Sequence, residues 1–284
     1  MIARKRVFDR VEKAVTGYID RLRPWAYPAH GTELPPVLVF AQVKSGSVFI
    51  QRALRRTLEV EVRHISGAGL SGGWFSYPEL SRFAKGNAVS REHMQARAEF
   101  PEILAAFNIR RAVIHIRDPR AVIVSWTRQM DRNLPDRGLR YVAFSCEQAV
   151  PELYLQWSFE QRLRWQVENV MPRMVAWTEG WVDLADRSDK VKFLVTDYAE
   201  LAQDSRDFIR KLLDFHEIPY REDWLKIPRH EVGRNNIHSI GRQQSGPDGS
   251  SPGSESRSPM HGEILELATA AIPPRLIERF GWNR

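Results

Sequence analysis

Residues 37–54 read VLVFAQVKSGSVFIQRAL, and the rest of the chain is best understood from this stretch. It begins with the apolar run Val37–Phe40, which is typical of a strand buried on both faces. Apolar residues return from Phe49 at helical spacing, and small residues surround Lys44 between the two segments. A tight loop at the start of a helix offers free N–H groups and the positive end of the helix dipole. The stretch therefore predicts an anion site that suits one phosphate or sulfate group.

This loop differs from the usual loop that binds nucleoside triphosphates. In a Walker A sequence, G-x-x-x-x-G-K-[ST], the lysine follows the second glycine, whereas Lys44 precedes Gly46. Taken alone, the loop fits two interpretations about equally well. It is either an anion site or an ordinary loop in which a lysine lies near a glycine.

Beyond this stretch, apolar strands alternate with segments of helical length. The further strands are predicted at 60–65, 88–90, 111–116 and 191–195, and the helices at 48–58, 99–107, 119–130 and 148–186, with a last helix at 261–280 interrupted near Pro273-Pro274. This alternation predicts a three-layer α/β fold, in which helices flank a central parallel sheet. Ligands of such sheets bind at the carboxyl ends of the strands.

The whole chain, residues 1–284, is predicted to form a single domain with two additions. The first is an N-terminal amphipathic helix within residues 1–30, because apolar residues recur at helical spacing over 4–22. The second is a segment rich in Gly, Ser and Pro at 241–260, which we expect to form a flexible loop or a lid.

Composition limits the class of protein. A net charge of +7 favours anionic partners, but 42 basic residues are interspersed with 35 acidic ones, which argues against a nucleic-acid partner. The single cysteine, Cys146, excludes an intramolecular disulfide and a cysteine-cluster metal site. The sequence has no apolar run long enough to cross a bilayer and no signal peptide at its start, so we expect a cytoplasmic protein. Peripheral contact with a membrane and the oligomeric state stay open.

A second stretch, VIHIRDPRAVIVSW at 113–126, has the same organisation as the first. A strand is predicted to end at Arg117, and Asp118-Pro119 starts a helix that carries Ser125 two turns further on. A guanidinium and a hydroxyl at these positions suit the oxygens of one phosphate. The alternative is that Arg117 only pairs with Asp118 or another carboxylate.

Together the two stretches resemble the sulfotransferases that use 3′-phosphoadenosine 5′-phosphosulfate (PAPS) as sulfate donor and release PAP. Lys44-Ser45-Gly46-Ser47 resembles the family's 5′-phosphosulfate loop, and Arg117-Asp118-Pro119-Arg120 through Ser125 resembles its 3′-phosphate motif. The likeness continues in Tyr198-Ala199-Glu200-Leu201 and FIRKLLDFHEIP, with a fainter trace in PRLIERFGW. The resemblance covers roughly residues 36–220.

The resemblance implies roles for individual residues. Lys44 and Ser47 would hold the 5′-phosphosulfate, with Ser45 and Gly46 shaping the loop, and Arg117 and Ser125 would hold the 3′-phosphate. Adenine neighbours are expected at Phe49 and Tyr198, and a late loop arginine, Arg242, is a weaker candidate for the 3′-phosphate. The chain departs from the family pattern at Val48, where a hydroxyl residue is common, and at Ala121, where an aspartate is frequent.

The general base is expected in SREHMQ at 90–95, which resembles the family's Lys-Thr-His element. This places His93 as the base and Arg91 as a second cation beside the phosphosulfate, and histidine titrates in a range that suits the removal of a hydroxyl proton. Glu79 is the carboxylate alternative. His115, in the middle of a strand, is expected to be a packed core residue, and so are the tryptophans between Trp157 and Trp181.

The sequence therefore predicts a PAPS-dependent sulfotransferase that needs no metal and acts on a hydroxyl or amine, either of a small metabolite or of a glycan. Two alternatives stay open. A P-loop kinase of small molecules is disfavoured by the position of Lys44 and by the lack of a clear carboxylate for magnesium. A non-catalytic anion-binding protein would hold the nucleotide without transferring sulfate.

Overall fold

The computed structural model describes residues 34–66, 74–227 and 260–283, and its centre is a five-stranded parallel sheet. The strands are β1 (Val37–Ala41), β2 (Glu61–Val62), β3 (Ala88–Glu92), β4 (Arg111–Ile116) and β5 (Lys192–Asp197), in the order β2-β3-β1-β4-β5. Every residue of β1 is buried, as its unbroken apolar sequence predicts for the central strand of a parallel sheet. The expected helix at 4–22 and nearly all of the expected loop at 241–260 lie outside the described residues.

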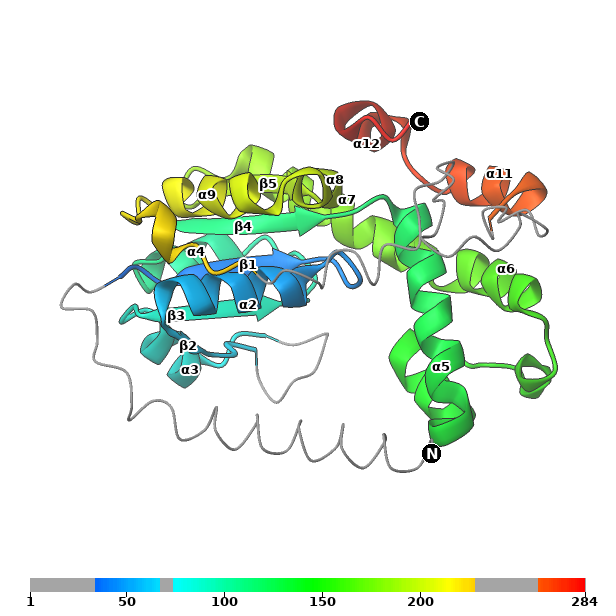
Figure 1. Cartoon of the computed structure of the whole chain (residues 1–284). Helices are drawn as coiled ribbons and strands as arrows, with labels where there is room; N and C mark the ends of the chain where they lie inside the picture. The colour runs from blue at the N-terminus through cyan, green and yellow to red at the C-terminus, as the bar shows by residue number, and fades with distance from the viewer. Residues whose placement is uncertain (1–33, 67–73, 228–259, 284) are drawn as a thin grey trace, which may run out of the picture.

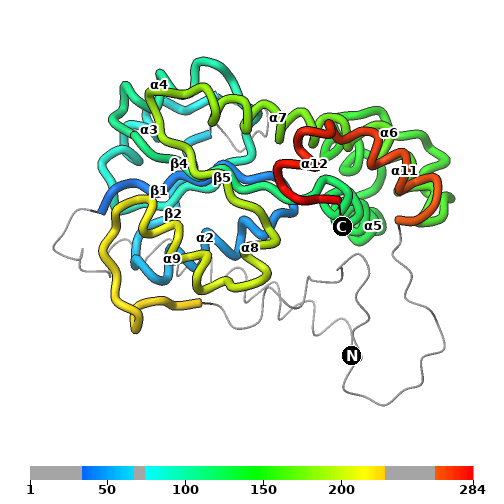
Figure 2. The backbone as a smooth tube through the Cα atoms, turned by 90° about the horizontal axis from the view of Figure 1, so that it is seen from above, coloured from blue at the N-terminus to red at the C-terminus, as the bar shows by residue number. Residues whose placement is uncertain are grey.

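Helices cover both faces of the sheet, as Figures 1 and 2 show. One face is covered by α2 (Ser47–Leu58), α8 (Tyr198–Gln203) and α9 (Ser205–Phe215), and the other by α3 (Tyr77–Phe83), α4 (Phe100–Ala106) and α7 (Met171–Arg187). Alternate β1 residues serve the two layers: Val39 packs with Phe49 and Ile50 of α2, while the ring of Phe40 stacks on Trp181 of α7 at 4.0 Å between centroids. The predicted three-layer α/β fold is confirmed.

A group of helices stands beyond the carboxyl ends of the strands, on the right of Figure 1. It consists of α5 (Pro119–Cys146), α6 (Phe159–Asn169), α11 (Gly262–Ala270) and α12 (Pro274–Phe280), with the short 3-10 helix η3 (Glu152–Leu155). Asp118 caps α5 by accepting a hydrogen bond from the Arg120 N–H, and Pro119 occupies the first turn, as the sequence predicted.

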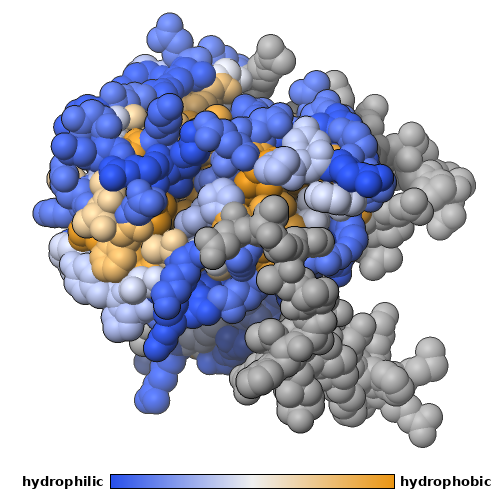
Figure 3. Space-filling view, turned by 90° about the vertical axis from the view of Figure 1, so that its left-hand side faces the viewer, coloured by the Kyte–Doolittle hydropathy of each residue, from blue (hydrophilic) through white to orange (hydrophobic). Residues whose placement is uncertain are grey.

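The opposite end of the molecule, seen in Figure 3, is mostly hydrophilic with apolar residues showing in between.

Several boundaries differ from the predicted ones. The helix expected at 119–130 continues to Cys146, with a kink at Gly138. The helix expected at 148–186 is broken into η3, α6 and α7, because the Ser158 side chain caps a new helix in a capping box with Gln161 and Pro172 lies in the first turn of α7.

The strand expected at 60–65 is only Glu61–Val62. It ends early because the Ile65 N–H donates to the buried carboxylate of Glu92, at 2.9 Å, and not to a neighbouring strand.

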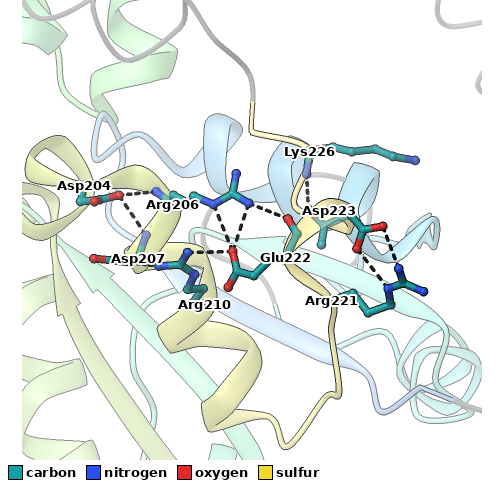
Figure 4. Close-up of polar contacts among 9 residues, drawn as sticks. Asp204, Arg206, Asp207, Arg210, Arg221, Glu222, Asp223 and Lys226 are labelled. Carbon is teal, nitrogen blue, oxygen red and sulfur yellow. Dashed lines mark hydrogen bonds and ion pairs between the residues drawn. The ribbon is translucent and has the colours of Figure 1, made fainter.

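The last described residues before position 228 are held to α9 by ion pairs and to α2 by a hydrogen bond, both shown in Figure 4. Arg206 and Arg210 both pair with Glu222 in the 3-10 helix η4 (Glu222–Trp224). The Lys226 N–H donates to Thr57 in α2. These contacts hold the chain against the helical layer that also supports the loop after β1.

Candidate functional site

The loop after β1 lies at the centre of the carboxyl edge of the sheet. Because β1 lies between β3 and β4, the segments that leave these three strands meet there, which is where ligands of such sheets bind. The loop is fixed from beneath: the Ser45 hydroxyl donates to the Gln42 carbonyl at 2.7 Å, and the Gln42 N–H donates to the His115 carbonyl at 2.9 Å. The Ser45 hydroxyl therefore helps to hold the loop in this conformation.

Two residues of the loop have left-handed backbone conformations. Lys44 has φ 62° and Gly46 has φ 86°, and a non-glycine residue such as Lys44 adopts this conformation only where the surroundings enforce it. A Cβ at Gly46 would lie 3.0 Å from Leu201 and 3.1 Å from the Tyr198 ring, so glycine is required here for space as well as for φ.

The N-terminus of α2 points its positive end into the site. Gly46 is the N-cap residue, no side chain caps the helix, and its first turn contains no acidic residue. A helix start without these compensating groups favours an anionic ligand. Ser47 lies at the first helical position, and its hydroxyl accepts a hydrogen bond from Arg91, at 3.3 Å. Val48, where a hydroxyl residue was expected, is 44 % exposed beside it.

Of the residues that the structure describes, the Lys44 ammonium contacts a side-chain amide and no carboxylate. Its Nζ donates to Gln129 Oε1 at 2.9 Å. Burial lowers the pKa of Lys44, and the charges of Arg132 and Arg117 lower it further. Gln129 follows Ser125 by one turn of α5, so Ser125 lies on the helix face that is directed to the Lys44 loop. An incoming anion would relieve the repulsion among these cations.

Arg117 lies directly after β4, buried to 7 % exposure. It donates from its backbone N–H to Gln42 Oε1 and from Nη1 to the Lys44 carbonyl, both at 2.9 Å. Its guanidinium lies over the Tyr198 ring, 4.1 Å from the centroid. These contacts bring three sequence-predicted residues, Lys44, Arg117 and Tyr198, to one place. The alternative pairing of Arg117 with Asp118 is not what the structure shows, because Asp118 is engaged by Arg120.

His93 follows β3 at the same edge of the sheet. Its Nδ1–H donates to the Ala41 carbonyl at 2.6 Å, which leaves Nε2 as the acceptor for Arg91 Nη1 at 2.7 Å. Burial lowers the pKa of His93 to about 4, with a further contribution from the charge of Arg91. His93 is therefore neutral at physiological pH, and its basic nitrogen is occupied by Arg91.

His115 is a structural residue, as expected. It is fully buried in β4, where Nε2–H donates to the Ser45 carbonyl at 2.8 Å and Nδ1 lies 2.9 Å from the Thr196 hydroxyl. Burial lowers its pKa to about 4, so the ring is neutral. His115 thereby fixes the Lys44 loop from the side of the sheet.

The other expected site residues lie elsewhere or outside the described residues. Phe49 is 5 % exposed within the core between the sheet and α2, so its ring packs in the interior in this structure. Both carboxylate oxygens of Glu79 are engaged, by Arg63 at 3.2 Å and by Arg82. Arg242 is not among the described residues. Trp177 and Trp181 are buried, and both indole N–H groups donate to the Met94 carbonyl.

Three buried donor atoms at the site have no hydrogen-bond partner among the described residues. They are Arg91 Nε, Arg117 Nε and Gln42 Nε2. A buried donor is normally paired, so this group suits a ligand that brings acceptor oxygens. Within the same described residues, no cluster of three or more His, Cys, Asp or Glu side chains suits a metal ion.

Sequence reasoning missed several residues of the site. Four of them form hydrogen bonds to an expected site residue or to the segment beside one: Gln42, Gln129, Glu92 and Asp197. Gln42 was detectable, since a glutamine directly after a buried strand interrupts an otherwise apolar run. Gln129 was not, because only the direction of α5 brings it to Lys44.

In the part of the chain that the structure describes, no helix is both long and apolar enough to span a bilayer.

Comparison with known protein families gives a model that matches more than half of the chain. The sulfotransferase domain model matches residues 34–238. No curated protein matches the sequence. Similar solved structures include a mouse sulfotransferase complexed with PAP, at 15 % identity over 87 % of this chain and 82 % of that one, with a TM-score of 0.47. A sulfotransferase from Alicyclobacillus acidocaldarius is 13 % identical over 89 % of this chain and 100 % of that one, with a TM-score of 0.48.

Proposed function

Because this chain belongs to the sulfotransferase family, we propose that it transfers the sulfuryl group of PAPS to a hydroxyl or amine of an acceptor. The acceptor class is a small metabolite or a glycan. The observation that carries the donor assignment is a group of three cations at the uncapped start of α2: the half-buried Lys44 and Arg91 and the buried Arg117. Among the described residues, the Nε atoms of Arg91 and Arg117 have no hydrogen-bond partner. A cytoplasmic location and a single domain over residues 1–284 remain predictions.

The residues at the site fit two anionic groups. Lys44, Ser47 and the first turn of α2 would hold the 5′-phosphosulfate, because they combine a cation, a hydroxyl and the helix dipole. Arg117 and Ser125 would hold the 3′-phosphate, for which Arg117 Nε offers a donor that has no partner within the described part of the chain. The Tyr198 ring packs against the Arg117 guanidinium in a cation–π contact that helps to hold it in place.

In the transfer, PAPS supplies an activated sulfuryl group whose bond to the 5′-phosphate breaks as the acceptor oxygen or nitrogen bonds to sulfur. Lys44 would stabilise the negative charge that develops on the leaving phosphate. His93 Nε2 would receive the acceptor proton, since this nitrogen is unprotonated while Nδ1–H is held by the Ala41 carbonyl. Arg91 must first leave Nε2, and the oxygens of a bound phosphosulfate offer it another partner.

The test is transfer of labelled sulfate from PAPS to a panel of phenols, alcohols, amines and saccharides. The wild-type protein should sulfate at least one class, and Lys44→Ala should lose transfer because the leaving group is no longer stabilised. Lys226→Ala, at an exposed lysine outside the site, is the matched control and should retain transfer. PAP binding without transfer to any acceptor would favour the non-catalytic alternative, and phosphate transfer from magnesium-ATP would favour the kinase.

A further inference from the structure

Trp282 lies near the C-terminal end of the chain, outside the matched residues 34–238, yet it contacts both segments that flank Arg117. The residue follows α12 through Gly281, whose φ of 64° turns the chain back. It is 6 % exposed and belongs to the core cluster that also contains Leu276. In Figures 1 and 2, α12 lies at the end of the sheet where the strands point.

The first contact reaches the segment after β4. The Trp282 carbonyl accepts a hydrogen bond from Arg120 Nη2. The same guanidinium pairs with the Asp118 carboxylate through Nε and Nη2, at 2.7 to 3.1 Å. Since Asp118 follows Arg117 directly, this contact fixes the turn from which the Arg117 side chain leaves the sheet.

The second contact reaches the segment after β5. The Trp282 indole N–H donates to Asp197 Oδ2 at 3.1 Å, while Asp197 Oδ1 caps α8 by accepting from the Ala199 N–H at 2.6 Å. The capped helix begins with Tyr198, the ring on which the Arg117 guanidinium rests. The indole therefore holds the carboxylate that orients the support of Arg117.

We propose that Trp282 is a positioning residue for the 3′-phosphate site, which it holds by joining the Arg117–Arg120 turn to the Asp197–Tyr198 turn. This inference rests on the proposed function, because it takes Arg117 as a ligand of the 3′-phosphate. Its consequence is specific: loss of the indole N–H should weaken recognition of the 3′-phosphate more than recognition of the rest of the nucleotide.

The experiment measures the dissociation constants of PAP and of AMP, which lacks the 3′-phosphate, by calorimetry. The dissociation constant of AMP divided by that of PAP reports the contribution of the 3′-phosphate. In Trp282→Phe the ratio should fall by about fivefold to tenfold, because a charge-assisted hydrogen bond is lost from the support of Arg117.

Trp177→Phe is the matched control. Trp177 is buried to 5 % exposure and also donates its indole N–H, but its acceptor, the Met94 carbonyl, keeps Trp181 as a second donor. The control should leave the ratio unchanged. If Trp282→Phe unfolds the protein, incorporation of benzothienylalanine at 282 removes the N–H and keeps the ring shape.

The outcomes separate the two proposals. A wild-type protein that binds PAP no more tightly than AMP would refute the assignment of Arg117, and the proposed PAPS site with it. A wild-type preference for PAP that persists in both Trp282 variants would refute the positioning role alone. Equal losses for PAP and AMP would make Trp282 a general packing residue, and would also refute it.

Discussion

Replacement of His115 by glutamine should make the protein less sensitive to acid. His115 is buried in β4, and burial lowers its pKa to about 4, whereas an unfolded chain restores the ordinary value of about 6.5. Between these values the unfolded state binds more protons than the folded state. The free energy of unfolding therefore rises with pH in this window and falls when the solution is acidified.

The expected size follows from the two pKa values. At pH 5 the unfolded imidazole is almost fully protonated and the folded one is almost fully neutral, so acidification from pH 7 to pH 5 costs about 2 kcal/mol through His115. Glutamine does not titrate, and its amide N–H can replace the Nε2–H that donates to the Ser45 carbonyl. The variant should lose about 2 kcal/mol less than the wild type over this pH change.

Urea unfolding at pH 7 and pH 5 measures the difference. His93 and His216, whose pKa values are also lowered to about 4, remain in both proteins, so their contributions cancel. His261→Gln, at an exposed histidine, is the control and should follow the wild type. If the His115 variant loses as much stability on acidification as the wild type, then the buried ring is not held neutral in the way described.

Three further predictions concern the site and its support. Gly46→Ala should lower the free energy of unfolding by about 1–3 kcal/mol, because φ is 86° and a Cβ would meet neighbours at 3.0 Å; urea titration checks this, and wild-type stability would contradict it. Arg117→Ala should weaken PAP binding by about 2–3 kcal/mol and leave AMP binding nearly unchanged, as measured by calorimetry, and equal losses would count against its assignment. Glu222→Gln should change stability only slightly in urea, because its pairs with Arg206 and Arg210 are exposed; a large loss would show that the ion pairs hold the segment more firmly.

The strand, loop and helix around Lys44 were predictable because local rules agree there. A fully apolar run predicts a buried strand, the small residues predict a tight loop, and helical spacing resumes directly after it. The start of α5 was equally clear, since Asp118-Pro119 is both a cap and a first turn. The two loops meet because the sheet order places β1 beside β4.

Other features depend on contacts between distant segments. The hydrogen bond between Arg91 and His93 Nε2 depends on how both side chains turn at the end of β3, which spacing does not specify. Burial of Phe49 depends on the rotation of α2 against α9, although its position in the sequence suggested a base contact. Trp282 lies 85 residues from Asp197 along the chain, so only the weak resemblance in PRLIERFGW pointed to this segment.

We propose that the site around Lys44 binds PAPS and not a nucleoside triphosphate. Thermal unfolding in the presence of PAP, AMP or magnesium-ATP tests it most directly, because a ligand that binds only the folded state stabilises it by about 2.7 kcal/mol at one hundred times its dissociation constant. PAP should raise the melting temperature without magnesium, and by more than AMP at the same concentration. A rise with magnesium-ATP and none with PAP would show that the site binds a nucleoside triphosphate instead.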